Sequence, residues 1–252
     1  PPRYEVRPEN MDADSKDAAR LALNVLNSKW NECKLNAKRI PLYMWMQECG
    51  HAYIKVTWDD SLGKMVTDPM SGETSYEGDI RCDVVPAFEV FPDPLAKSLD
   101  DCQYIIQAKV RPLDYFKTHY PERGHLVKEE AAWLLSAQYE QRINSLNSRG
   151  PAQGGMTDIM KNCALELIKY ERRSKKYPNG RMIVVATGIL LENKELPIGE
   201  IPFAKFDDIV IGGKYYPESV ITHLRPIQDQ YNEIIRRRAS WANKLLAGKY
   251  TA

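Results

Sequence analysis

The sequence of 252 residues has few cysteines, no long apolar run and almost no net charge. Its five cysteines are an odd number scattered along the chain, which indicates folding in a reducing cytoplasm and not a disulfide framework. No apolar run approaches the roughly 20 residues needed to cross a bilayer, so no membrane contact is expected. Lysine and arginine number 35 against 34 aspartates and glutamates, a net charge of +1. Any DNA contact must therefore come from a local arrangement of charges, because there is no global field to recruit nucleic acid.

The motifs of the common catalytic and cofactor-binding sites are also missing. The chain has no G-x-x-x-x-G-K-[ST] phosphate loop, no G-x-G-x-x-G, no H-E-x-x-H, no G-x-S-x-G and no paired C-x-x-C. The sequence therefore predicts a protein that is not an enzyme, with no cofactor, no catalytic residue and no metal ligand. Cys49 and His51 offer two metal ligands, but a metal site normally needs three or four. We interpret them as a buried cysteine and a surface histidine.

Adjacent aspartates occur three times, at Asp59-Asp60, Asp100-Asp101 and Asp207-Asp208. Carboxylates of this type can hold the two metal ions of a nuclease. Neighbours on a strand point to opposite faces, however, and each pair lies at an expected turn. Turn and helix-cap chemistry is therefore the preferred interpretation. The other histidines lie far apart and are assigned to surface or helix-end positions: His119, His125 and His223.

Hydrophobic periodicity predicts an α+β fold for a chain that is 43% hydrophobic and 27% charged. One long helix is expected from Ser15 to Gln47, kinked or split at Pro41 and followed by Gly50 as a stop. Strands are expected over residues 53–58, 79–91, 104–110, 164–172 and 182–191, the last two joined at Asn179-Gly180. Shorter helices are expected over 113–120 and 128–143, and a mobile linker over 145–155. Helices and strands are segregated more than they alternate, which favours α+β over a doubly wound α/β fold.

The C-terminal segment predicts the longest helix of the chain. Pro217 suits the first helical position, and Gly248 is a natural stop. Apolar residues recur between them at helical spacing: Val220, Leu224, Ile227, Tyr231, Ile234, Ile235, Trp241 and Leu245. The chain therefore divides into an α+β domain over residues 1–216 and a long helix over residues 217–252. At 1.5 Å per residue the helix would span roughly 45 Å, which favours a strut or a subunit contact.

Several stretches resemble the tailed-bacteriophage portal protein family, in the same order along the chain. Ile201-Pro202-Phe203, followed by residues 220–232, is similar to the region where the wing domain of a portal protein runs into its stem helix. Residues 83–94, continuing to 110–117, resemble the wing segment, and residues 10–59 resemble the helix and strand before it. The resemblance implies a wing domain of mixed helices and antiparallel strands, followed by a long stem-like helix.

The resemblance also implies a function. Portal proteins are structural subunits of a closed ring, usually of about twelve copies, at one vertex of the capsid. DNA passes through the central channel during genome packaging and ejection. The implied partners are viral double-stranded DNA, bound without sequence specificity, together with terminase, head-completion and tail adaptor proteins, and capsid and scaffolding proteins. The implied location is the capsid portal vertex of the virion, after assembly in the host cytoplasm, and the clip, the rest of the stem and any crown would follow Ala252.

Within this resemblance, the basic residues of the long helix are candidate contacts. The three residues of Arg236-Arg237-Arg238 fan out by about 100° each, so they cannot all face one ligand. We assign Arg236, with Lys244 about two turns on, to contacts with DNA in the channel. Arg237 and Arg238 are assigned to the subunit interface, together with four apolar residues of the same helix: Ile227, Tyr231, Ile234 and Trp241. The basic cluster at 172–176 is expected at a solvated hairpin tip.

Two alternatives stay open beside the portal interpretation. One is a metal-dependent nuclease or nucleotidyl enzyme that uses the scattered carboxylates. The other is a different helical adaptor protein, in which the long helix forms a coiled-coil contact. Its apolar spacing is closer to 3.6 residues than to a strict heptad, which weakens the second alternative.

Overall fold

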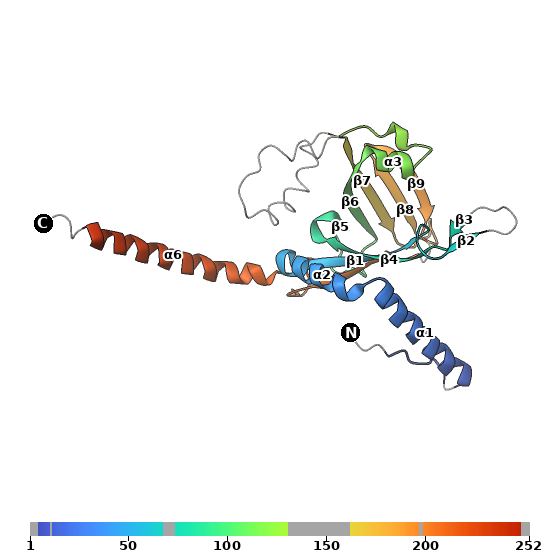
Figure 1. Ribbon diagram of the computed structural model, residues 1–252, viewed down its shortest axis with the longest axis horizontal. Helices are drawn as coiled ribbons and strands as arrows, with labels where there is room; N and C mark the ends of the chain where they lie inside the picture. The colour runs from blue at the N-terminus through green and yellow to red at the C-terminus, as the bar shows by residue number, and fades with distance from the viewer. Residues whose placement is uncertain (1–4, 11, 68–73, 131–161, 197–198, 248–252) are drawn as a thin grey trace.

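A computed structural model describes residues 5–10, 12–67, 74–130, 162–196 and 199–247. Two helices near the N-terminus lead into a body built of two main β-sheets, and one long helix leaves that body on the other side (Figure 1). The sheets are antiparallel throughout the described chain, and the helices are not interleaved with parallel strands. The predicted α+β class is therefore confirmed.

The N-terminal segment forms two helices, α1 (Ala13–Glu32) and α2 (Leu35–Cys49). The prediction of one helix broken at Pro41 is wrong in position, because the break lies at Lys34, whose backbone is left-handed with a φ of 51°. Pro41 stays inside α2, where packing of the helix against the strands that follow outweighs one missing N–H. Gly50, with a φ of 83°, ends α2 as predicted.

The smaller main sheet has three antiparallel strands in the order β10-β1-β4. Its bounds are β1 His51–Asp59, β4 Asp79–Pro86 and β10 Phe203–Asp207. The strand predicted at 53–58 is thus confirmed, and it forms the centre of this sheet. Tyr53 lies opposite Val85 on one side and Lys205 on the other, so the sheet joins segments about 150 residues apart. Beyond the turn after β1, a small hairpin is formed by β2 (Met65–Thr67) and β3 (Thr74–Tyr76).

The larger sheet has five antiparallel strands in the order β5-β6-β7-β8-β9. Its bounds are β5 Val90–Pro92, β6 Tyr104–Pro112, β7 Cys163–Glu171, β8 Arg181–Ala186 and β9 Ile189–Glu195. The strand predicted over 79–91 is interrupted by a 3-10 turn, η1 (Ala87–Glu89), which carries the chain from one sheet to the other. The strand predicted over 182–191 is two strands, because Thr187 and Gly188 both take positive φ values and reverse the chain.

The segment after β6 is short and helical, as predicted. It forms α3 (Leu113–His119) and a 3-10 turn, η2 (Gly124–Leu126). Of the helix predicted over 128–143, residues 131–143 lie outside the described residues. Residues 128–130 are not helical, since Glu130 runs beside β7: its N–H donates to the Cys163 carbonyl, and its carboxylate accepts from the Leu165 N–H. The linker predicted over 145–155 also lies outside the described residues.

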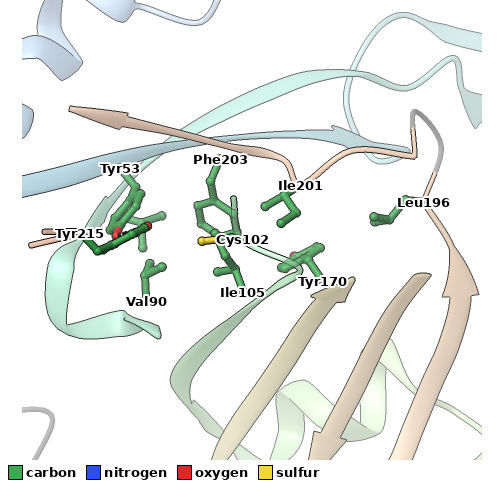
Figure 2. Close-up of a cluster of buried hydrophobic side chains, with 10 residues drawn as sticks. Tyr53, Val90, Cys102, Ile105, Tyr170, Leu196, Ile201, Phe203 and Tyr215 are labelled. Carbon is green, nitrogen blue, oxygen red and sulfur yellow. Dashed lines mark hydrogen bonds between the residues drawn. The ribbon is translucent and has the colours of Figure 1, made fainter. Parts of the chain in front are cut away.

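The main hydrophobic core lies where the two sheets meet (Figure 2). Tyr53 and Phe203 enter it from the three-stranded sheet, and Ile105 and Tyr170 from the five-stranded sheet. The hydroxyls of Tyr53 and Tyr215 lie 3.1 Å apart, which satisfies both polar groups inside the apolar cluster. A second, smaller cluster forms under α3: Phe116, Val127, Ala164 and Ala186. The main cluster joins the two sheets, and the smaller one packs α3 onto the five-stranded sheet. The long helix extends from the resulting body.

Candidate subunit and DNA interface

The long C-terminal helix, α6 (Val220–Ala247), begins three residues later than predicted. Pro217 is not its first residue, because the neighbouring Glu218 pairs with Ile209 in an isolated antiparallel bridge. The backbone hydrogen bonds of that bridge run in both directions, at 3.1 and 2.9 Å. Pairing with Ile209 holds Glu218 in an extended conformation. Pro217 therefore lies outside the helix, although proline suits the first helical position.

Side chains cap the start of α6 in place of the proline. The Asp208 carboxylate accepts a hydrogen bond from the Val220 N–H at 2.8 Å, and the Ser219 hydroxyl accepts one from the Ile221 N–H at 3.0 Å. These bonds satisfy two of the N–H groups that every helix leaves unpaired at its start, and the carboxylate also complements the helix dipole. The interpretation of Asp208, the second residue of Asp207-Asp208, as a helix-cap residue is therefore confirmed.

The start of α6 contacts the backbone at the end of α2. The Ser219 hydroxyl donates to the carbonyl of Gln47. Gly50 lies directly against the segment that leads into α6, and a Cβ added there would be 2.9 Å from the Pro217 carbonyl oxygen. The direction in which α6 leaves the body is thus set by a close backbone contact that requires glycine.

Beyond its first turn, α6 projects from the body as a rod (Figure 1). Its 28 residues correspond to about 42 Å at 1.5 Å per residue. The apolar residues assigned to the subunit interface are more than half exposed: Ile227 63%, Tyr231 59%, Ile234 55% and Trp241 69%. No described part of this chain covers them. Because most helical stability in proteins comes from packing an apolar face, this helix needs a partner surface.

The helical repeat separates the assigned residues into two faces. Taking Tyr231 as reference, Ile227 and Ile234 lie within about 60° of it, and Arg238 within about 20°. Arg238 therefore lies in the apolar stripe itself. Arg236 and Lys244 each lie about 140° away, on the opposite side of the helix. The helical repeat thus brings Ile227, Ile234 and Arg238 to the side of Tyr231, with Trp241 about 80° from it. Arg237, also assigned to the interface, lies about 120° from Tyr231, on the same side of the helix as Lys244.

Two of the three consecutive arginines share one carboxylate. Arg237 Nε lies 2.7 Å from Glu233 Oε1, and Arg236 pairs with the other oxygen of the same carboxyl group. The hydrogen bonds from Arg237 and then Arg236 hold the pKa of Glu233 below its usual value. Such exposed pairs within one helix contribute little to stability. Both guanidinium groups are more than three-quarters exposed, so both can meet a further partner.

The other predicted polar residues are mostly structural. Asp59 accepts the Ser61 N–H at 3.0 Å in the turn after β1, and Asp207 pairs with Lys205 at 3.0 Å. Within the described residues, no group of three or more His, Cys, Asp or Glu side chains could hold a metal ion. The exposed positions predicted for three histidines are confirmed: His119, His125 and His223.

His51 is the exception, because it is buried and not on the surface. It begins β1 beside the start of α6, with its ring between those of Tyr53 and Tyr216 at centroid distances of 5.5 and 5.4 Å. Burial, and then the nearby charge of Lys205, lower the pKa of His51 to about 4. The sequence alone does not indicate this burial, since Tyr216 and the returning strand β10 lie more than 150 residues further along the chain.

The basic cluster at 172–176 lies in the connection between β7 and β8. Arg172 is not a solvated tip residue as predicted: its guanidinium donates to the Leu99 carbonyl at 3.0 Å and its N–H to the Gln103 carbonyl. Lys175 and Lys176 are exposed, in agreement with the prediction.

A polar cleft between the two sheets has no counterpart among the predicted sites. Its volume is about 680 Å³, and its walls carry charges of both signs. At its floor Glu166, only 1% exposed, accepts a hydrogen bond from the Tyr120 hydroxyl at 3.0 Å and pairs with Arg111 at 3.3 Å. Across the cleft, Lys55 donates to Gln107 at 2.8 Å, and burial lowers its pKa to about 8. These opposed charges compensate one another, which accounts for the burial of the Glu166 carboxylate.

None of the described helices is both long enough and apolar enough to cross a membrane. A comparison with curated proteins finds no match to this chain. A comparison with protein families matches residues 1–245 to the family described as phage P22-like portal protein. That match covers the two-sheet body and nearly all of the projecting helix, in agreement with the resemblance noted in the sequence. The chain is therefore a member of the P22-like family of phage portal proteins.

Proposed function

We propose that this chain is a structural subunit of a portal ring at one vertex of a phage capsid. The ring would form the channel through which the genome is packaged and ejected. Terminase, head-completion and tail adaptor proteins would dock on it, and capsid and scaffolding proteins would surround it. Assembly would take place in the host cytoplasm, and the finished ring would belong to the virion.

The observation that carries this proposal is the uncovered apolar stripe of α6. Four large side chains from Ile227 to Trp241 are between 55% and 69% exposed on a helix that projects from the body. A contiguous apolar surface of this kind marks an interaction site in a water-exposed protein. In a portal ring the neighbouring subunit supplies the cover, because long helices packed side by side line the tunnel.

A closed ring also sets a condition on the interface. Its contacts are heterologous, so one face of a subunit meets a different face of the next. The stripe around Tyr231 would be one of these faces. Arg238 lies within the stripe, so we assign it to an ion pair with a carboxylate of the neighbouring subunit. We assign Arg237 to the same interface although it lies about 120° from Tyr231, because its exposed guanidinium can reach a subunit packed along the flank of α6.

The opposite side of α6 suits occasional contacts with DNA. Arg236 and Lys244 lie about 140° from Tyr231 and are exposed. A channel wall must let DNA slide, so its phosphate contacts should be sparse and sensitive to salt. The near-zero net charge of the chain agrees with that requirement.

We further propose that the chain has no catalytic activity of its own. Asp59 and Asp208, which belong to two of the acidic pairs that would serve a two-metal nuclease, accept main-chain hydrogen bonds in a turn and at a helix start. ATP-driven steps of packaging would then belong to the docked terminase.

The proposal is tested by whether rings still form when two apolar residues of the α6 stripe are replaced by aspartate. In a full-length portal protein containing this chain, Ile227→Asp with Tyr231→Asp should abolish rings, because two carboxylates would enter an apolar contact. The matched control is Ile227→Leu with Tyr231→Phe, which keeps the apolar surface and should keep the rings. Native mass spectrometry and electron microscopy report the result. Unchanged rings in the aspartate variant would refute the assignment of the stripe to the interface.

A further inference from the structure

Helix α1 is joined to the sheets by a small set of contacts at its C-terminal end. None of its 20 residues is buried. Lys29 reaches the Asp79 carboxylate at 2.7 and 2.9 Å, and the Cys33 thiol donates to the Ile80 carbonyl at 3.5 Å. Both partners are the first residues of β4. Since a partly exposed ion pair contributes little to stability, these contacts hold the direction of α1 only weakly.

A second thiol lies at the same place on β4. Cys82 follows Ile80 by two positions, and it is buried beneath the joint between α1 and α2. Residues two positions apart on a strand point to the same face, so Cys82 lies beside the site where the Cys33 thiol meets the Ile80 carbonyl. Burial, and then the Cys33 side chain, raise the pKa of the Cys82 thiol. The backbone of Cys82 is fixed by its pairing with Val56 of β1 and by the Lys38 ammonium, which donates to the Cys82 carbonyl.

We propose that Cys33 and Cys82 form a redox-sensitive clasp, in which a low-molecular-weight disulfide converts the two thiols into an intramolecular disulfide that pins α1 to β4. Cys33 is at the end of α1, directly before the left-handed residue Lys34. A bond at this position would remove the rotation of α1 about that joint. A reducing cytoplasm would keep the clasp open, and an oxidising exterior would close it.

The exchange has two steps. The thiolate of Cys33, which is the more exposed of the two, attacks one sulfur of the oxidant and forms a mixed disulfide, releasing one small thiolate. The Cys82 thiolate then attacks the Cys33 sulfur, and the second small thiolate leaves. The two protein thiols lose two protons and two electrons, and the oxidant becomes two thiol molecules. Burial raises the pKa of the Cys82 thiol to about 11, so Cys82 is the poorer first nucleophile and the second step should be faster at higher pH.

Intact mass and hydrogen exchange test this inference on the whole chain. After treatment with oxidised glutathione, the wild-type protein should lose about 2 Da without gaining glutathione, and peptide mapping should join Cys33 to Cys82. Amide exchange in the last two turns of α1 should then slow by roughly tenfold. Cys33→Ser and Cys82→Ala should each remove both effects. Cys49→Ser is the matched control, since Cys49 is another half-buried thiol at a helix end, and it should behave like the wild type.

Three outcomes would overturn the inference. These are an unchanged mass, a stable glutathione adduct at Cys33, or a Cys33–Cys82 disulfide that leaves exchange in α1 unaltered. None of them depends on ring formation, so the clasp and the portal ring can fail separately.

Discussion

Replacing Gly50 by alanine tests whether the contact between α2 and the start of α6 is as close as the structure indicates. Gly50 has a φ of 83°, and a left-handed backbone costs an L-residue about 1–2 kcal/mol. The new Cβ would also lie 2.9 Å from the Pro217 carbonyl oxygen and 3.2 Å from the Ser219 nitrogen. Both are backbone atoms, so the start of α6 must shift, and forcing extra volume into a packed site costs about 1–3 kcal/mol. We expect a total loss of about 3 kcal/mol in the free energy of unfolding.

Gly213→Ala separates the two contributions. Gly213 has a φ of 79° and lies in the turn before α6, but a Cβ added there meets no described atom within 4 Å. It should therefore lose only the conformational part, about 1–2 kcal/mol. Urea unfolding followed by tryptophan fluorescence gives both values, provided that the slope m stays constant. Equal losses in the two variants, within about 0.5 kcal/mol, would refute the close contact at Gly50.

The same two variants link this contact to assembly. A shift of the helix start by a few tenths of an ångström is magnified along a rod of about 42 Å. Gly50→Ala should therefore lower the yield of rings in a full-length portal protein, and Gly213→Ala should not. Electron microscopy of both preparations, at equal protein concentration, provides the measurement.

Three further predictions concern protonation, charge and chemistry. Because the folded-state pKa of His51 is lowered to about 4 from an ordinary value near 6.5, the unfolded chain takes up the proton first, and stability should fall as the pH falls from 6.5 towards 4. His51→Phe should flatten this part of the stability profile in thermal unfolding; an identical profile would contradict the assignment. Single alanine substitutions across Arg236–Arg238 should separate two effects: loss of Arg236 should change packaging efficiency in a salt-dependent way with rings intact, and loss of Arg237 or Arg238 should weaken the ring. If all three variants assemble and package normally, the cluster is solvated surface. The isolated protein should hydrolyse neither ATP nor plasmid DNA, with or without magnesium, and a turnover that disappears on mutating Asp207 and Asp208 would favour the nuclease alternative.

Much of α6 could be predicted from the sequence because the signals are local. Apolar residues recur at helical spacing from Val220 to Leu245, and that period needs no knowledge of the rest of the fold. The stop of α2 at Gly50 and the turn after β1 rest on single residues with well-known backbone preferences. The start of α6 was misplaced, because Glu218 finds a pairing partner at Ile209 that no helix signal reveals.

The break between α1 and α2 shows the same limit. Pro41 is the stronger breaker in isolation, yet packing on the sheet keeps it helical, and the chain turns at Lys34 instead. The candidate interface was also only partly predictable. The members of the apolar stripe followed from periodicity, but their exposure did not, since the same pattern would also suit a helix buried against its own body.

The order and type of most elements, the α+β class and the resemblance to portal proteins could thus be read from local sequence signals. Four features required the three-dimensional structure: β10 returns to pair with β1, His51 is buried, the Cys33 thiol contacts β4 two residues from Cys82, and α6 leaves the body uncovered. The difference lies in how far apart along the chain the interacting residues are. Helical period, caps and turns depend on residues a few positions apart, whereas strand pairing, burial and the direction of a helix depend on contacts between segments up to about 150 residues apart.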